Sequence, residues 1–400
     1  MIDPKRPRIL LLALALAFVG ATSCGSKGDE AKKDDASESD DDEPKKKSKK
    51  AKKADVDPEL AKKADALAKQ VKNGRFPGEV TKDKENAPAI LHLAKAGEDT
   101  DTVCAALAAM ETMYTSSDKS KDRILIDAAY NGIVLARLGE TEAKIQAFAL
   151  KAASHSILGE KADTKIIDKM IELAESHPKP EGRYAAIDKL WAAHQLSKNA
   201  KGVEAIAKAL DAKEPWLVSS GLFRLRSVYS GYADKAGLEK KLVALLSHAD
   251  PGVRGRAADL LSSTAGFEKA KQQEIAQKLL PLLGDSNAFV KSSAMSGLAW
   301  LKHAPAIHEI VKQVDDLTSN TYEIKGFTNL DGTSGWVHHD GSAWSRTGDA
   351  ALYALKTLSS TTKEKFDYKI DYKNVEPDLK KAASDAKAWY AKVKADVPTQ

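Results

Sequence analysis

A helical spacing pattern recurs along the chain about every 36 residues, and it constrains the fold more than any other feature. In its best copy, Val253, Ala257 and Leu261 stand four residues apart, so they share one face of a helix. The same spacing recurs at Val290–Ala294–Leu298, Leu217–Gly221–Leu225, Gly182–Ala186–Leu190 and, more weakly, Ile145–Ala149–Ala153. A period of this length with two helices per unit indicates a solenoid, in which neighbouring units bury one another's apolar stripes.

Helix signals accompany the pattern. Asp250 is placed to cap the N-terminus of a helix, and Pro251 suits the first helical position. Another amphipathic stretch precedes the second helix of each unit, as in residues 238–249 and 271–283. The small residue in the middle of each triplet allows neighbouring helices to approach closely. We therefore expect an all-α fold, a right-handed α-solenoid of helix pairs.

These units resemble the HEAT family, in which an Asp-Pro turn leads into a helix with the pattern Val-Arg-x-x-Ala-x-x-x-Leu. Residues 238–266 match this pattern well. Residues 271–303 keep Asp285 but have Lys291 in place of the arginine and lack the proline. The remaining units match in spacing only, and the resemblance covers roughly residues 120–360. It implies a HEAT-like helical solenoid.

One unit is open to a second interpretation. Gly132, Gly139 and Phe148 fall at a spacing similar to that of tetratricopeptide repeats, although Lys144 and Lys151 stand where that family has alanine. Both interpretations give a right-handed helical array.

The chain divides into five predicted segments along its length. They are a lipoprotein signal peptide at 1–23, a disordered charged tether at 24–56, an N-terminal helical cap at 57–120, HEAT-like repeats at 121–360 with an insertion at 318–346, and a C-terminal strand and helix cap at 361–400.

The first 24 residues have the parts of a bacterial export signal. A basic start is followed by the apolar run Ile9–Gly20, which is too short to span a membrane. The sequence Ala21-Thr22-Ser23-Cys24 resembles a lipobox, which implies lipidation at Cys24, and Gly25 resembles the pattern sent to the outer membrane. We expect a lipid-anchored protein of the bacterial envelope, most simply at the outer membrane facing the periplasm. The alternative is a plain secreted protein.

The tether is acidic over residues 29–43 and rich in lysine over 45–53, so it cannot bury enough apolar surface to fold. It is expected to be a solvated spacer, with contact to anionic lipid as the alternative. A net charge of +5 over 400 residues gives no support to nucleic-acid binding. The only other cysteine, Cys104, lies in an apolar helical stretch and is expected to be a buried small hydrophobe.

The repeat is interrupted near its C-terminal end. Thr347, Ala351 and Leu355 restore the spacing about 20 residues later than the period predicts. The extra residues predict a strand at Tyr322–Thr328, a turn at Asp331-Gly332 and a returning strand at Trp336–His338.

Two interpretations of this insertion remain open, and they are compatible. In the first, it is a recognition loop whose partner-binding residues are Trp336, His338, His339 and Trp344. In the second, it is a β-flap that covers the end of the solenoid. The alternation of Phe366, Tyr368, Ile370 and Tyr372 with charged residues favours the second, because it predicts a half-buried strand that could pair with the insertion.

The sequence offers no arrangement of residues typical of catalysis. It has no histidine spacing suited to a metal and no nucleophile elbow, Walker loop or dinucleotide-binding fingerprint. Arg254 and Arg256 are expected to support the repeat turn. The predicted function is therefore a non-catalytic scaffold or adaptor without cofactor, which binds an unidentified protein through the concave face and the insertion. The alternative is an enzyme or small-ligand-binding protein that uses the loop around 318–346.

Overall fold

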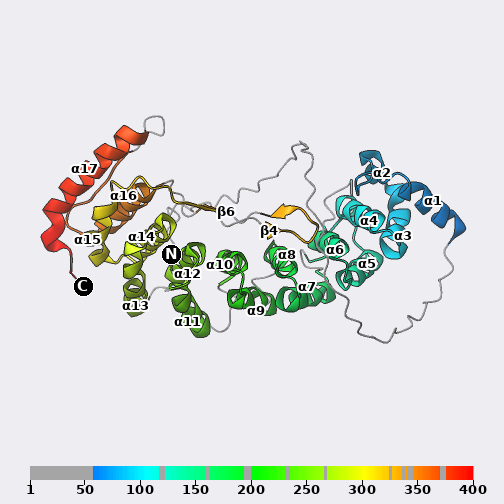
Figure 1. The fold of residues 1–400 in the computed structure, drawn as a ribbon, viewed down its shortest axis with the longest axis horizontal. Coiled ribbons are helices and arrows are strands. Elements are labelled where there is room, and N and C mark those ends of the chain that lie inside the picture. Colours follow the sequence, from blue (N-terminus) through cyan, green and yellow to red (C-terminus); the bar gives the residue numbers. More distant parts are fainter. Residues whose placement is uncertain are drawn as a thin grey trace, which may run out of the picture. The chain divides into compact units, whose positions relative to one another are not determined.

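Helices form most of the computed structural model (Figure 1). The structure describes residues 57–116, 122–157, 162–192, 200–229, 235–264, 268–323, 327–335, 338–340, 346–369 and 375–399. The predicted signal peptide, Cys24 and the tether lie outside these residues. None of the described helices is both long enough and apolar enough to cross a membrane.

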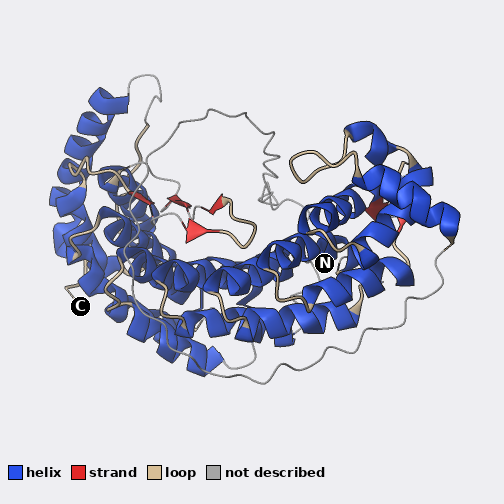
Figure 2. Cartoon of the chain, turned by 45° about the vertical axis from the view of Figure 1, so that its right-hand side comes forward, coloured by secondary structure: helices blue, strands red, loops and turns tan. Residues whose placement is uncertain are grey.

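Two layers of helices make up the stack (Figure 2). The first helices of the pairs are α5 (Ala128–Leu138), α7 (Thr164–Ser176), α9 (Ala200–Lys208), α11 (Lys235–Leu245), α13 (Lys269–Leu279) and the short α15 (Ile307–Ile310). The second helices are α6 (Ala143–Ser156), α8 (Pro180–Ala192), α10 (Pro215–Val228), α12 (Pro251–Thr264), α14 (Ala288–Trp300) and α16 (Thr347–Leu358). Each second helix packs against the next, from α6 to α16, so together they form the second-helix layer. The predicted all-α solenoid is confirmed.

The predicted helical register is also confirmed. Val253, Ala257 and Leu261 are fully buried, and every member of the other triplets is buried as well, including Gly182 and Gly221. The helix start at Asp250 is as predicted, because its carboxylate accepts a hydrogen bond from the backbone N–H of Val253 at 3.1 Å. The small middle residues thus lie at helix–helix contacts, where a larger side chain would not fit.

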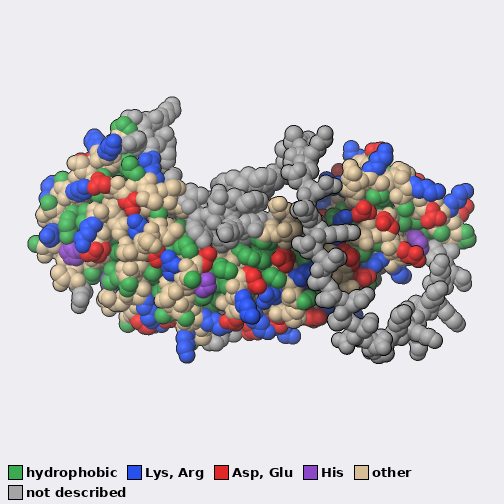
Figure 3. Space-filling model, in the orientation of Figure 1, with side chains coloured by type: hydrophobic (Ala, Val, Ile, Leu, Met, Phe, Trp, Pro, Cys, Tyr) green, Lys and Arg blue, Asp and Glu red, His purple; other side chains and the backbone are tan. Residues whose placement is uncertain are grey.

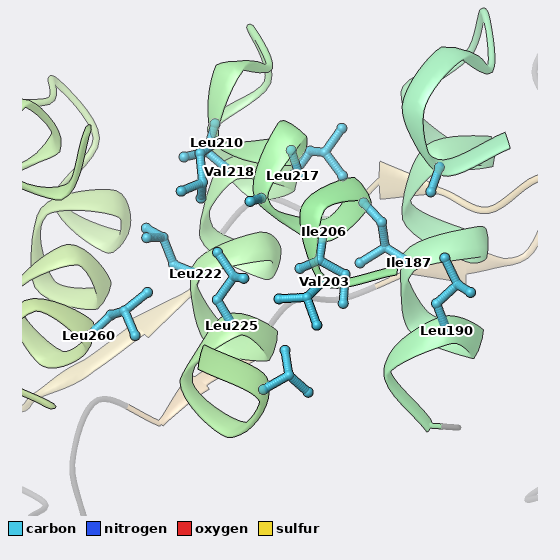
Figure 4. Close-up of a cluster of buried hydrophobic side chains, with 14 of the residues drawn as sticks. Ile187, Leu190, Val203, Ile206, Leu210, Leu217, Val218, Leu222, Leu225 and Leu260 are labelled. Atoms are coloured by element: carbon cyan, nitrogen blue, oxygen red, sulfur yellow. The ribbon is translucent and has the colours of Figure 1, made fainter. Parts of the chain in front are cut away.

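The core is continuous from one unit to the next. Figure 4 shows one part of it, where side chains of α8, α9, α10 and α12 meet. The buried residues labelled there are Ile187, Leu190, Val203, Ile206, Leu210, Leu217, Val218, Leu222, Leu225 and Leu260. Burying each such side chain contributes about 1.5–3 kcal/mol. No single helix buries its apolar side chains alone, so the units stabilise one another.

The stack continues into the region before residue 121. It contains α1 (Pro58–Ala68), α2 (Gly78–Lys82), α3 (Ala87–Ala96) and α4 (Thr100–Met113). Helices α3 and α4 pack together as a pair, and α4 packs against α6. Cys104 of α4 is fully buried, as predicted, and burial raises the pKa of its thiol to about 11.

The insertion forms two short antiparallel strand pairs, and their returning strands lie at Ser334–Gly335 and His338–Asp340 where one was predicted at Trp336–His338. Strand β3 (Thr321–Glu323) pairs with β6 (His338–Asp340), and β4 (Phe327–Thr328) pairs with β5 (Ser334–Gly335). The predicted strand at Tyr322–Thr328 is thus divided into β3 and β4. The predicted turn is present, and Gly332 has a φ of +81°, a conformation that glycine adopts without strain.

The C-terminal segment corrects one prediction. The described residues from 365 to 369 form no strand, whereas Ile370 and Tyr372 lie outside the described residues. Phe366 is buried, and its ring lies 5.4 Å from that of Trp389 in α17 (Val375–Val393). A helix therefore covers the apolar side of this segment, and the alternating pattern needs no partner strand.

Candidate functional site

Polar side chains connect consecutive units near the start of the second helices. Arg254 of α12 makes a two-pronged contact with Asp285, with its Nε at 2.8 Å from Oδ2 and its Nη2 at 2.9 Å from Oδ1. It also donates to the carbonyl oxygens of His248 and Ala249. The corresponding Arg183 of α8 pairs with Glu214 at 3.4 Å. The prediction that Arg254 supports the repeat turn is confirmed, and this arginine is occupied by structural contacts.

The base of the insertion is fixed to the last two second helices. Lys291 of α14 pairs with Asp316 at 2.5 Å, and the N–H of Gly348 donates to the carbonyl of Asp316 at 2.7 Å. A Cβ at Gly348 would lie 2.7 Å from the carbonyl oxygen of Val314. The chain thus leaves and re-enters the solenoid at a tightly packed point, which fixes the place from which the insertion starts.

Aromatic rings and arginines alternate across the second-helix layer in a group that we call the aromatic–arginine ladder. Its members are Tyr184 and Trp191 of α8, Phe223 and Arg224 of α10, Arg256 of α12 and Phe289 of α14. The rings of Trp191 and Phe223 lie 6.2 Å apart, which connects α8 to α10. The ladder therefore runs over four consecutive second helices, with Arg224, Arg256 and Phe289 buried and Phe223 exposed.

Arg224 is held by the α8 side of the ladder. Its guanidinium carbon lies 5.1 Å from the centre of the Tyr184 ring and 5.6 Å from that of Trp191. The guanidinium also pairs with the carboxylate of Asp188. Arg224 is buried, and its Nε has no hydrogen-bond partner. A buried donor without a partner is costly, so this arginine has bonding capacity that the described contacts leave unused.

Arg256, in the next second helix, makes ring contacts on both sides. Its guanidinium carbon lies 4.8 Å from the ring centre of Phe223 and 5.8 Å from that of Phe289. Gly255 allows this arrangement, because a Cβ there would lie 2.4 Å from the Phe289 ring. Cation–π contacts of this kind contribute about 0.5–2 kcal/mol. Burial raises the pKa of the neighbouring Asp259, although the charges of Arg226 and Arg256 oppose this effect.

Part of the ladder is open to solvent. The side chain of Phe223 is 43% exposed, and Trp191 is half-buried with its Nε1 donating to Ser227 at 2.5 Å. Positive and negative side chains are interspersed on the face shown in Figure 3. Aromatic and arginine side chains of this kind are the commonest energetic centres of protein interfaces.

The β4–β5 hairpin (residues 327–335) packs on the same layer, next to the ladder. Phe327 stacks flat on Trp216 of α10, with ring centres 4.1 Å apart and an interplanar angle of 6°. The edge of Tyr184 meets the same phenylalanine at 4.9 Å. Leu330, at the tip, is buried. Each aromatic pair contributes about 0.5–1.5 kcal/mol beyond its buried area.

An ion pair holds the other end of the hairpin. Lys151 of α6 lies 2.8 Å from Asp331, and its ammonium also sits 4.7 Å from the ring centre of Phe148. Burial alone would raise the pKa of Asp331, but hydrogen bonds from Lys151 and Thr333 outweigh it and hold that pKa below its ordinary value. We call Tyr184, Trp216 and Lys151 together the hairpin cradle.

The predicted site residues fall in two groups. Trp336 and Trp344 lie outside the described residues. His338 and His339 are in β6, where their backbones pair with Glu323 and Tyr322, and their side chains are outside the description. The prediction that these residues contact a partner therefore stays a prediction.

Sequence analysis missed both the ladder and the cradle. The sequence did contain a signal for the ladder: aromatic and arginine residues stand outside the apolar triplet positions of consecutive second helices. No such signal existed for the cradle, because its partners are far apart in sequence, as the 180 residues between Lys151 and Asp331 show.

The structure also contains cavities away from the ladder. One of about 790 Å³ lies beside α13 and is lined by Gln273, Glu274, Lys302 and His303, among others. A second, of about 250 Å³, lies beside α7 and His177. The described residues include no group of three or more histidine, cysteine or acidic side chains arranged to hold a metal ion.

Solved structures that are similar to this chain include an engineered protein and an archaeal repeat protein. The engineered protein has 18% identity over 83% of this chain and 80% of that chain and a TM-score of 0.46. The archaeal protein, a HEAT-like repeats protein from Thermococcus onnurineus NA1, has 17% identity over 60% of this chain and 96% of that chain and a TM-score of 0.42. No protein-family model and no curated protein matches the chain. Because these TM-scores are low, the solenoid assignment rests on the packing of the chain's own helices.

Proposed function

We propose that the protein is a non-catalytic scaffold that binds another protein through the second-helix layer. The observation that carries this proposal is the aromatic–arginine ladder, with the 43% exposed Phe223 at its centre. Rigid aromatic side chains lose little entropy on binding, and the arginines beside them are already held in place by ring and carboxylate contacts. This combination favours binding of a protein surface.

The proposal includes the residues of the insertion. Trp336, His338, His339 and Trp344 would contact the same partner, because the β4–β5 hairpin of the insertion packs next to the ladder. Insertions into repeat proteins commonly extend the binding face in this way.

Site-specific photo-crosslinking in intact cells tests which face binds the partner. A benzophenone amino acid would replace Phe223 in one variant and Lys240, an exposed residue of the first-helix layer, in the other. Crosslinking to a discrete protein is expected from position 223 and not from position 240. Equal crosslinking from both positions, or from position 240 alone, would contradict the proposed binding face.

We also propose that Cys24 carries a lipid that anchors the scaffold to the bacterial envelope. In this proposal the protein is attached to the outer membrane and faces the periplasm. The short apolar run and the lipobox-like residues before Cys24 support this proposal. A lipid anchor together with the tether would leave the solenoid free to reach a partner near the membrane.

Substitution of the cysteine tests the anchor. Cys24→Ala is expected to abolish metabolic labelling with a fatty acid and to release the protein from the membrane fraction. Cys104→Ala is the control, because that thiol is buried and should leave labelling unchanged. Labelling that persists in Cys24→Ala would overturn the anchor proposal and leave the scaffold proposal intact.

The alternative function is an enzyme or a small-ligand-binding protein that uses the insertion. It would require small-molecule binding that depends on residues around 318–346. A thermal-shift screen of the purified full chain against metabolites, with His338→Ala/His339→Ala as the paired variant, distinguishes the two. Stabilisation by a metabolite that the paired variant loses would favour the alternative.

A further inference from the structure

The β4–β5 hairpin rests on helices that precede it by more than 100 residues. Phe327 packs its ring against both Trp216 and Tyr184, whereas Asp331 reaches Lys151 of α6. Figure 1 shows β4 beside α6 and α8, far along the array from α15 and α16, between which the insertion begins and ends. The hairpin thus occupies part of the layer to which we assign binding.

The contacts between the hairpin and the cradle resemble those between a ligand and its binding site. One aromatic ring is stacked flat on an indole and met edge-on by a phenol, and one carboxylate is paired with an ammonium group. Phe327 and Asp331 stand four residues apart, so a single turn presents both groups to the cradle at once.

The turn is formed by the hairpin's own hydrogen bonds. The N–H of Asn329 donates to the carbonyl of Thr333 at 2.7 Å, and the N–H of Gly332 donates to the carbonyl of Asn329 at 2.9 Å. Asp331 accepts from the backbone N–H of Thr333 at 3.1 Å. A turn of this kind can be offered equally well by another chain, because its shape does not depend on the solenoid.

The cradle is likewise formed without the hairpin. Tyr184 is packed against the buried Arg224, and Trp216 follows Pro215 in the first turn of α10. Lys151 lies against Phe148 on its own helix. The hairpin itself is held by two short strand pairs, and the side chain of Lys151 is 39% exposed. A preformed site with a small occupant on a long connection is suited to exchange of that occupant.

We propose that the hairpin cradle is a peptide-binding subsite, that the β4–β5 hairpin occupies it as an internal competitor, and that a partner segment with an aromatic residue followed four residues later by an acidic residue displaces it. This inference deepens the proposed function and rests on it. It identifies the partner by chemistry: a turn that carries an aromatic ring and a carboxylate. The hairpin would then reduce binding of segments that lack either group.

Competition gives the inference a quantitative test. A tethered competitor acts at a high effective concentration, so removing it raises the affinity for an added peptide. A hairpin docked nine-tenths of the time would weaken peptide binding tenfold. The probe is a fluorescein-labelled peptide of residues 327–335, FTNLDGTSG, and the readout is fluorescence anisotropy with the purified full chain.

The double variant Phe327→Ala/Asp331→Asn removes both side chains by which the hairpin contacts the cradle. This disarmed variant is expected to bind the peptide at least tenfold more tightly than the unmodified chain. Thr328→Ala is the matched control, because Thr328 is exposed on the same strand, and it should bind as the unmodified chain does. Adding Trp216→Ala or Lys151→Met to the disarmed variant should reduce peptide binding at least tenfold. A peptide with alanine in place of its phenylalanine and asparagine in place of its aspartate should not bind.

Three results would overturn the inference. They are equal peptide affinity in the disarmed and unmodified chains, no binding to the disarmed chain, and a cooperative loss of the helical signal caused by the two hairpin substitutions. The last would show that the hairpin is a structural brace. The scaffold proposal has a separate readout, because crosslinking from position 223 can persist whichever result the peptide gives.

Discussion

The two units formed by α11 to α14 and the insertion-bearing unit formed by α15 and α16 are built from the same helical register but are stabilised differently. In the former, Arg254 reaches Asp285 across 31 residues, which is close to one repeat period. In the latter, the insertion places Asp331 against Lys151, 180 residues away. The regular units are therefore held by their neighbours in sequence. The insertion is held by helices that lie several units away.

This difference predicts two classes of substitution. Changes in the regular units should alter the free energy of unfolding, because buried side chains there hold consecutive helices together. Changes in the hairpin should alter access to the second-helix layer with little effect on helix stability.

Breaking a buried contact between units should have the largest effect. Arg254→Ala removes the ion-pair partner of Asp285, whose side chain is 11% exposed, so we expect a loss of about 3 kcal/mol in the free energy of unfolding. Lys241→Ala removes the exposed pair with Asp211 and should cost less than about 1 kcal/mol. Urea denaturation followed by circular dichroism measures both. Equal losses of unfolding free energy in the two variants would show that the buried ion pair between units stabilises the fold no more than an exposed one.

Overpacking the register should have the next largest effect. Ala257→Leu adds three carbon atoms at a fully buried helix contact and should cost about 1–3 kcal/mol. Lys240→Ala, on the exposed side of the first-helix layer, should change stability by about 0.5 kcal/mol or less. An unchanged denaturation midpoint for Ala257→Leu would mean that the contact between units is looser than the structure indicates.

Removing the ring of the hairpin should affect the helices little. Phe327→Ala is expected to lower the free energy of unfolding by about 1–1.5 kcal/mol, because the ring gives up two aromatic contacts while the repeat core is unchanged. It should increase acrylamide quenching of Trp216, which the ring covers at 4.1 Å. The increase should vanish in a Trp216→Phe background, which assigns it to that indole among the six tryptophans. A large loss of stability would place the hairpin in the same class as the repeat contacts.

Acid should release the hairpin by a small amount. The pKa of Asp331 is held below its ordinary value of 3.8. The stabilisation of the docked hairpin by the ionised Asp331 is therefore fully present above that pH and is lost as the pH falls further. The partial exposure of Lys151 limits this contribution to less than about 1 kcal/mol. Trp216 quenching measured from pH 6 down to about pH 2 should rise in the unmodified chain. The rise should be absent in Asp331→Asn, and its persistence there would assign the transition to another group.

Sequence alone determined the repeating part of this protein. The four-residue spacing of Val253, Ala257 and Leu261, the cap at Asp250 and the position of the insertion are local patterns, and local hydrogen bonding and burial govern them. Arg254 was correctly predicted as structural for the same reason. The strand predicted around Phe366 was wrong in its described part, because an alternating pattern cannot tell whether a strand or the helix α17 covers it.

Only the tertiary structure decided how distant segments meet. The aromatic–arginine ladder exists because stacking brings aromatic and arginine side chains of consecutive units into contact. The hairpin reaches the cradle because the connection from α15 to α16 returns to α6, α8 and α10. Periodicity reports which face of a helix is buried, but it carries no information about where an irregular segment comes to rest. That position is set by ring stacking and ion pairing between residues that the sequence keeps more than 100 positions apart.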